Sequence, residues 1–224
     1  MTMHNLLLWS ALGLAMLNWL VSSLRIKLLE YITKPATIVL LLLWLWQTSH
    51  FEGALIWFAA ALCFGLVGDI LLMLPGNHFV AGLIAFLLGH AAYTAGLNTT
   101  PPPLNLPSLV ITSLVITTGF AVFKRITASL DRKQQKYRQP LVAYTGILSI
   151  MLVSALLTLV RTEWAPLPAL MVSFGAVLFF VSDILIAWDK FVAPFQWRYL
   201  FIRSTYHLGQ FGLIIGAVLH FTAR

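Results

Sequence analysis

The sequence predicts an all-α membrane protein, a polytopic bundle of eight transmembrane helices that forms a single domain over residues 1–224. Hydrophobic residues make up 60% of the chain and charged residues only 9%, whereas about a quarter of a soluble domain is charged. Apolar runs close to the roughly 20 residues needed to span a membrane recur along the chain. Short turns separate them, with no linker between soluble domains, so we expect one bundle.

Eight apolar runs are the expected spans: about 5–21, 34–48, 53–74, 79–97, 108–123, 141–160, 167–188 and 199–221. The run at 5–21 lacks a basic leading region and a small-residue cleavage site, so we expect a retained helix rather than a signal peptide. Proline and glycine mark the turns, as in Pro75-Gly76 and Pro101-Pro102-Pro103. The chain has a single cysteine, Cys63, which excludes an internal disulfide.

The basic residues indicate the orientation of the bundle. If eight spans alternate in direction, one face holds twelve Lys and Arg residues and the other holds two, Arg161 and Arg224. The twelve are Arg25, Lys27, Lys34, Lys124, Arg125, Arg132, Lys133, Lys136, Arg138, Lys190, Arg198 and Arg203. The positive-inside rule therefore predicts a cytoplasmic basic face and both termini outside. We attribute the net charge of +7 to this topology and expect no binding of nucleic acid.

The two halves of the chain resemble each other weakly. VGDILLM in the third run resembles VSDILIA in the seventh, with the aspartates at Asp69 and Asp183. Lys34-Pro35 opens the second run as Gln139-Pro140 opens the sixth. The matching runs lie four apart and therefore point in the same direction, which predicts a parallel four-plus-four repeat.

Polar residues within the apolar runs fall mainly in the cytoplasmic half of the expected bilayer. Asp69 and Asp183 lie at similar depth, Lys34 is expected at the start of its span, and the outer halves are almost wholly apolar. A carboxylate inside a membrane costs at least about 2.5–3.5 kcal/mol, so such a residue usually has a partner or a function. The eight tryptophans mostly fall near the ends of the runs, where we expect interface anchors.

Helical spacing places several of these polar residues on common faces. A polar stripe on the last run comprises Arg203, Tyr206, His207 and Gln210. His90 and Tyr93 share a face of the fourth run. Small residues beside the aspartates are expected to let helices approach closely; they are Gly65, Gly68 and Ser182.

A purely structural interpretation stays open for each of these polar residues. The aspartates could form interhelical pairs with Lys or His. Lys34 could extend to the lipid headgroups. Tyr144 and Tyr206 could be interhelical hydrogen-bond donors, and the histidines could be packing residues.

Four stretches together resemble the lysoplasmalogenase family, the YhhN-like integral membrane proteins and their animal relatives. They are TKPATIVLLLLW at 33–44, FGLVGDILLMLPG to GHAAY at 64–93, LVAYTGILSIM at 141–151, and FFVSDILIAWDKF with STYHLGQ at 179–210. The ordered set KP, GDxLL, GHxxY, AY, SD and YxxxQ carries the resemblance over most of the chain.

The resemblance implies hydrolysis of the vinyl-ether bond of lysoplasmalogens to a fatty aldehyde and a glycerophospho-alcohol, without a cofactor. It implies Asp69 and Asp183 as the catalytic carboxylates. The family's other characteristic positions match Lys34, His90, Tyr93, Tyr144, Tyr206 and Gln210 here. His207 lies within the last motif, at a position of less fixed identity. The substrate would be a lysophospholipid within the bilayer, and the expected location is a bacterial inner (plasma) membrane.

The chemistry of vinyl ethers fits an intramembrane carboxyl group. The bond hydrolyses when an acid protonates the carbon β to the oxygen, which leaves an oxocarbenium ion. An apolar setting disfavours ionisation of a carboxyl group, and a second, ionised carboxylate could stabilise the cation, as in glycoside hydrolysis. Either Asp69 or Asp183 could be the acid. We expect Lys34 and Arg203 to hold the lipid phosphate.

Two other functions fit some of the same residues. Asp69, Asp183, His90 and His207 could bind zinc, as in ceramidase-like membrane hydrolases, although no local HxxxH pair is present and we expect no metal. The carboxylates could instead serve a transporter of lipids or small molecules. The apolar outer half argues against a complete transport path.

Overall fold

The computed structural model describes residues 3–223. Within them the chain forms eight α-helices and two short 3₁₀ helices. The α-helices are α1 (Met3–Ser23), α2 (Lys27–Ser49), α3 (Leu55–Met73), α4 (Phe79–Leu97), α5 (Leu106–Ala128), α6 (Arg138–Leu157), α7 (Pro166–Phe191) and α8 (Arg198–Phe221). The 3₁₀ helices are Gln135–Tyr137 and Thr158–Val160. Arg224, counted above on the less basic face, lies outside the described residues.

The ends of the helices follow local sequence signals. The side chain of Asn105 accepts a hydrogen bond from the backbone N–H of Ser108 at 2.9 Å and caps the start of α5. Pro166 is the first residue of α7, a position at which proline removes no needed donor. His50 ends α2 in the left-handed conformation, with φ of 47°.

The largest departure from the expected boundaries is at the start of the second helix. The second helix begins at Lys27, seven residues before the expected start at 34, and Pro35 lies inside it. Proline removes one backbone hydrogen bond but is tolerated within membrane helices, where neighbouring groups compensate. Lys34 therefore lies within α2 and is only 3% exposed, so it does not belong with the loop charges of the basic face.

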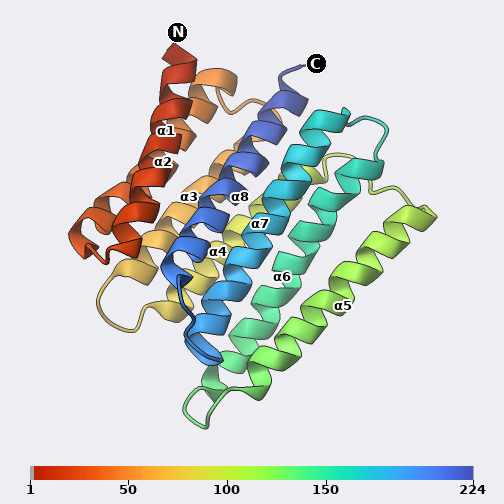
Figure 1. Ribbon diagram of the computed structural model, residues 1–224. Coiled ribbons are helices and arrows are strands. Elements are labelled where there is room, and N and C mark those ends of the chain that lie inside the picture. Colours follow the sequence, from red (N-terminus) through yellow and green to blue (C-terminus); the bar gives the residue numbers. More distant parts are fainter. Residues whose placement is uncertain (1–2, 224) are drawn as a thin grey trace.

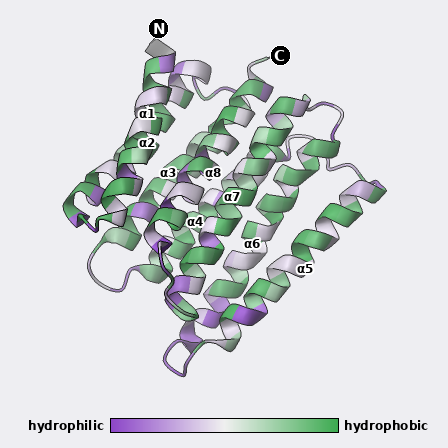
Figure 2. Ribbon diagram, viewed as in Figure 1, coloured by the Kyte–Doolittle hydropathy of each residue, from purple (hydrophilic) through white to green (hydrophobic). Residues whose placement is uncertain are grey.

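The fold is that of a polytopic membrane protein. Among the described helices, seven are long and apolar enough to cross a membrane, and α8 is the one that does not qualify. The reason lies in its sequence: α8 carries the polar stripe at residues 203–210 and is mostly buried against other helices. In Figure 2 apolar residues cover most of the helical lengths.

The helices run roughly parallel to one common axis, and the two ends of the chain lie at the same end of the bundle (Figure 1). α8 lies inside the bundle between α3 and α7, whereas α1 and α5 are at opposite edges. α8 thus passes along the same length as its neighbours. An even number of passes, as eight spans would give, accounts for termini at one end.

Glycine allows the closest contact in the bundle, between α7 and α8. A Cβ atom on Gly175 would lie 2.5 Å from the backbone N of Leu213, and one on Gly212 would lie 2.7 Å from Cα of Gly175. No side chain fits there, so the two backbones touch, as small residues permit in membrane bundles. This contact fixes α8 and its polar stripe against α7.

The tryptophans are divided between the surface and the interior. Trp9, Trp46, Trp57 and Trp197 are exposed, as interface anchors require. Trp44 and Trp164 are buried, so the expectation of an anchor is wrong for these two.

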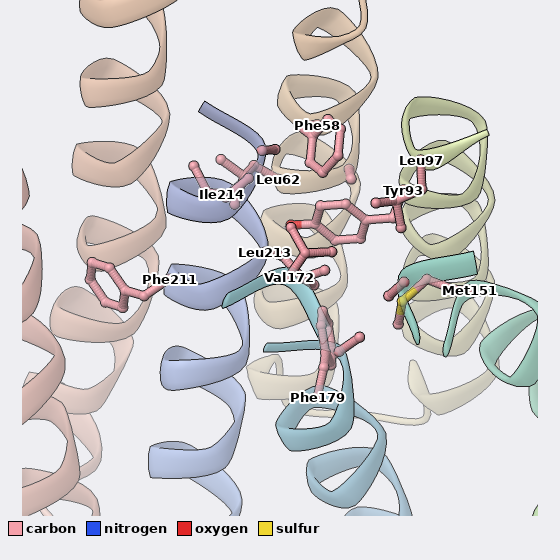
Figure 3. Close-up of a cluster of buried hydrophobic side chains, with 14 of the residues drawn as sticks. Phe58, Leu62, Tyr93, Leu97, Met151, Val172, Phe179, Phe211, Leu213 and Ile214 are labelled. Atoms are coloured by element: carbon pink, nitrogen blue, oxygen red, sulfur yellow. The ribbon is translucent and has the colours of Figure 1, made fainter. Parts of the chain in front are cut away.

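Aromatic and aliphatic side chains from α3, α4, α7 and α8 fill the centre of the bundle (Figure 3). Phe179 and Tyr93, both almost fully buried, meet there with their ring centroids 6.4 Å apart. Phe58 packs edge-on against Tyr93 from α3. Phe179 also packs against the polar residues His90 and Tyr206.

Candidate active site

Asp69 is fully buried and lies between partners from two other helices. Nζ of Lys34 in α2 is 2.6 Å from its Oδ1, and the hydroxyl of Tyr206 in α8 donates to its Oδ2 at 2.8 Å. The Lys34 ammonium also lies 5.1 Å from the centre of the Tyr206 ring, within the range of a cation–π contact. Asp69 therefore has a full positive charge beside it.

The hydrogen bonds continue from Tyr206 into α4. The amide of Gln210 donates to the Tyr206 hydroxyl at 3.4 Å, and the hydroxyl of Tyr93 donates to Oε1 of Gln210. Gly65 leaves room for this network, because a Cβ there would be 3.3 Å from Nε2 of Gln210. We refer to Lys34, Asp69, Tyr93, Tyr206 and Gln210 as the Asp69 cluster.

Asp183 has different partners, which are not permanently charged. The hydroxyl of Tyr144 in α6 donates to Oδ2 of Asp183 at 2.7 Å. Nε2 of His90 in α4 is 3.1 Å from the same oxygen and 3.0 Å from the Tyr144 hydroxyl. We refer to these three residues as the Asp183 cluster.

A single ring separates the two clusters. Phe179 in α7 packs edge-on against His90, with ring centroids 4.9 Å apart, and against Tyr206 at 5.4 Å. Between the described side chains of Asp69 and Asp183 there is no hydrogen bond. The two carboxyl groups that the sequence pairs are thus neighbouring but separately partnered.

The Asp183 cluster borders an empty space. Asp183 and Tyr144 line a small cleft of about 50 Å³ whose other walls are almost entirely apolar and come from α3, α4, α5, α6 and α7. This volume exceeds the roughly 10–15 Å³ that one water molecule needs, so a small part of a bound molecule fits beside Asp183. Asp183 is 9% exposed, whereas Asp69 is 0% exposed and does not line the cleft. Asp183 is therefore the carboxyl group that a bound molecule could touch.

The remaining candidate residues surround the two clusters. Nδ1 of His207 accepts a hydrogen bond from Nε1 of Trp19 in α1 at 3.0 Å, which leaves the ring proton on the opposite nitrogen. Arg203 binds Glu30 of α2 through two hydrogen bonds, at 3.0 and 2.5 Å. Ser182 donates to the backbone carbonyl of Ile202 at 3.1 Å and joins α7 to α8.

Three contributing residues were not among the candidates from the sequence. Trp19 and Glu30 supply the partners of His207 and Arg203, and Phe179 separates the clusters. Glu30 carries a usable signal, because it is the one acidic residue in the first turn of α2. Trp19 and Phe179 look like any aromatic residues in an apolar helix, and their contacts lie 188 and roughly 90 residues away along the chain.

The donor atoms do not converge as a metal site would require. Among the side chains that the structure describes, those of residues 5–223, no three from His, Cys, Asp or Glu come together. Asp69 holds Lys34, and Nδ1 of His207 accepts from Trp19. The four residues considered for zinc therefore fall into three separate groups, which argues against the four-ligand arrangement of a zinc site.

The fold and the site together define a class: a polytopic membrane protein with buried, partnered carboxyl groups beside an apolar cleft. The chain belongs to the YhhN family, whose profile matches residues 29–217. The resemblance noted from the motifs is thereby confirmed.

Related proteins support this assignment. A YhhN protein of Escherichia coli, described as an uncharacterized membrane protein, is 26% identical over 93% of this chain and 98% of its own length. The mouse lysoplasmalogenase TMEM86B is 31% identical over 83% of this chain and 74% of its own. The human lysoplasmalogenase TMEM86B is 29% identical, over 78% and 69% respectively. No solved structure gives a significant match.

Proposed function

We propose that this protein is an intramembrane hydrolase that cleaves the vinyl-ether bond of lysoplasmalogens. The observation that carries the proposal is Asp183, a carboxyl group held by Tyr144 and His90 at the wall of an apolar cleft. Relatives named lysoplasmalogenase give the bond to be cleaved. The products would be a fatty aldehyde and a glycerophospho-alcohol.

Asp183 is the acid in this proposal. Asp69 is fully buried and paired with the Lys34 ammonium, whereas Asp183 lines the cleft and has a hydroxyl and an imidazole as partners. A protonated Asp183 can transfer its proton to the vinyl carbon β to the ether oxygen. The C=C electron pair forms the new C–H bond, and the ether oxygen shares its electrons with the adjacent carbon to give an oxocarbenium ion.

The same residue can complete the reaction. The Asp183 carboxylate left by the first step faces the cation and accepts a proton from the water that attacks it. The resulting hemiacetal breaks its C–O bond to release the aldehyde and the alcohol. His90 does not line the cleft and holds Asp183 in place through its Nε2 atom.

Asp69 has a supporting role in this account. Its charge is opposed by Lys34, and it contacts the site through Tyr206, which packs against Phe179. We propose that the Asp69 cluster fixes α2, α3, α4 and α8 to one another beside the cleft. Lys34, engaged with Asp69, is then not a phosphate ligand.

The proposed topology places this chemistry in the cytoplasmic half of a bacterial inner membrane, with both termini outside. The excess of Lys and Arg at the end of the bundle opposite the termini supports it.

Aldehyde release from a purified lysoplasmalogen tests the proposal. We expect the wild type in detergent to form fatty aldehyde and glycerophosphoethanolamine in equal amounts. Asp183→Asn keeps the shape but cannot donate a proton to carbon, so we expect a rate lower by about 10²–10⁴-fold. Glu52→Gln, an exposed carboxylate at the end of the bundle that holds the termini, is the matched control and should keep full activity.

Folding is checked by comparing the thermal unfolding of both variants with the wild type. An Asp183→Asn variant that folds and still turns over at the wild-type rate would refute the role of Asp183. A wild type that releases no aldehyde would refute the proposed function.

A further inference from the structure

At its basic end the cleft at Asp183 adjoins a second, charged space, the Lys190 pocket. Leu72, Phe79 and Ile186 line both. Lys190 lies seven residues after Asp183 on α7, which is two helical turns and about 10 Å along the axis. The two side chains therefore point to the same side of α7.

Lys190 is the cation of this pocket whose charge is not neutralised. Arg203, also in the pocket wall, binds Glu30, and Asp189 lies 3.4 Å from Arg198. Lys190 forms no ion pair within residues 3–223, and its Nζ lies 4.4 Å from the centre of the Phe79 ring. The pocket thus has a free ammonium at its junction with the Asp183 cleft, which suits a phosphate group.

On its other side the Asp183 cleft adjoins a long groove between α5 and α6. Phe123 and Thr145 line both spaces. The groove has a volume of about 1050 Å³ and extends to Pro101 and Leu157, toward the end of the bundle that carries the termini. Most of its wall is apolar, with Ile116, Phe120, Ile150 and Val153 among its residues. Such a groove suits a hydrocarbon chain.

We propose that these three adjoining spaces bind one single-chain phospholipid lengthwise. The phosphate lies at Lys190, the first bonds of the chain lie beside Asp183, and the remaining hydrocarbon lies in the α5–α6 groove. The first space is charged, the second is apolar with one acid, and the third is apolar. A lysophospholipid has its phosphate, its first chain bonds and its hydrocarbon tail in the same order. The glycerol backbone and the flexible lysine side chain can bridge the two turns between Lys190 and Asp183.

This inference rests on the proposed function for its substrate class, but it is tested by binding rather than by turnover. The probe is a 1-hexadecyl lysophosphatidylcholine, whose saturated ether cannot undergo protonation at a double bond and is therefore not cleaved. Its dissociation constant is measured on the purified full chain in detergent. The same chain on uncharged glycerol (1-hexadecylglycerol) and an octyl analogue of the phospholipid separate the contributions of head and chain.

The proposed binding of the phosphate at Lys190 is tested with Lys190→Gln. Lys133→Gln in the exposed α5–α6 connection is the matched control. We expect Lys190→Gln to weaken binding of the hexadecyl phospholipid about tenfold, as for the loss of one charged hydrogen bond. Binding of hexadecylglycerol should not change. Equal binding of the phospholipid by the two variants would overturn the assignment of the phosphate site, as would an equal loss for hexadecylglycerol.

The proposed binding of the hydrocarbon chain in the α5–α6 groove is tested with Gly146→Phe. Gly146 lines the groove, and a Cβ atom there would meet nothing within 4 Å, so the ring has room to project without disturbing the packing. Gly13→Phe on α1, which also has open space, is the control. We expect Gly146→Phe to weaken the hexadecyl phospholipid at least tenfold and the octyl analogue far less. An unchanged affinity for the hexadecyl lipid would overturn the chain site.

Failure of this inference and failure of the proposed function are distinguishable. If the hexadecyl lipid binds with the expected losses in the variants but no aldehyde is released from a lysoplasmalogen, the proposed function is wrong and the proposed lengthwise binding is supported. If Lys190→Gln and Gly146→Phe bind the hexadecyl lipid as tightly as the wild type and still cleave lysoplasmalogens, the proposed lengthwise binding is wrong and the proposed function stands.

Discussion

At the scale of single residues, two aspartates in similar sequence motifs have different surroundings. Asp69 has a lysine and a tyrosine and no exposure, whereas Asp183 has a tyrosine and a histidine and borders the cleft. The first carboxyl group is closed off and ion-paired, whereas the second is within reach of a bound molecule. The motifs GD and SD alone do not distinguish them, because the partners come from other helices.

The buried pair of Lys34 and Asp69 leads to a prediction about stability. Removing one partner leaves an uncompensated charge in the interior, at a cost of about 3–5 kcal/mol. We expect Lys34→Met to lower the thermal stability strongly, and the double variant Lys34→Met with Asp69→Asn to recover part of the loss. Thermal unfolding of the wild type, both single variants and the double variant in detergent measures this coupling. Losses that simply add would contradict the pairing.

At the scale of helices, α7 and α8 pack backbone to backbone. Gly175 and Gly212 leave no room for a side chain, so a larger residue must separate the helices. We expect Gly175→Leu to displace the Tyr206 stripe from Asp69 and to lower stability, whereas Gly13→Leu on α1 should be neutral. The yield of folded protein and its unfolding temperature check this. Equal stability of the two variants would contradict the close contact.

A second element-scale feature holds the end of the bundle that carries the termini. Arg161, only 5% exposed, donates to the backbone carbonyl and hydroxyl of Thr100 at 3.1 and 2.7 Å and to Oδ1 of Asn98 at 2.9 Å. Burial lowers the pKa of the Arg161 guanidinium from its usual value, so these partners offset a real desolvation cost. The network fastens the connection between α4 and α5 to the end of α6.

Loss of this network should loosen the loop without touching the chemistry. We expect Arg161→Met to cost about 2 kcal/mol or more, because hydrogen bonds to charged groups contribute about 1.5–3 kcal/mol each. Arg132→Met, in an exposed loop, is the control. Unfolding temperatures of the two variants decide the matter, and an unchanged Arg161→Met would show that the network is not stabilising.

At the scale of the whole molecule, each aspartate has one partner from its own half of the chain and one from the other half. Asp69 takes Lys34 from α2 and Tyr206 from α8, and Asp183 takes Tyr144 from α6 and His90 from α4. Each aspartate thus has one partner from the preceding helix and one from the last helix of the other half. A parallel repeat would give this arrangement, although the duplication itself stays a prediction.

Much of this fold follows from the sequence, because apolar runs and turn residues are local signals. The ends of α4 agree with the expected 79–97 residue for residue, whereas Pro35 misled the placement of α2. The polar residues of the clusters were also identifiable, because a charge in an apolar helix is conspicuous. Interhelical pairs with Lys or His were one possibility, but the sequence did not indicate which residues pair, since Lys34 meets Asp69 and Tyr206 only after three helices have packed.

The predicted topology can be measured on whole cells. With Cys63 changed to Ser, a cysteine at Glu52 should react with an impermeant maleimide in intact cells, because that loop is predicted to be outside. A cysteine at Lys133 should react only after the membrane is permeabilised. Labelling of the Lys133 position in intact cells would reverse the orientation.

Protonation of a vinyl carbon is the central claim, and the mass of the aldehyde formed in D₂O tests it most directly. The purified protein is given a lysoplasmalogen in D₂O, and the aldehyde is reduced at once to the alcohol to prevent exchange. The account predicts one deuterium on the carbon next to the aldehyde in every product molecule, and a slower turnover than in H₂O. An aldehyde without deuterium at that carbon would contradict it.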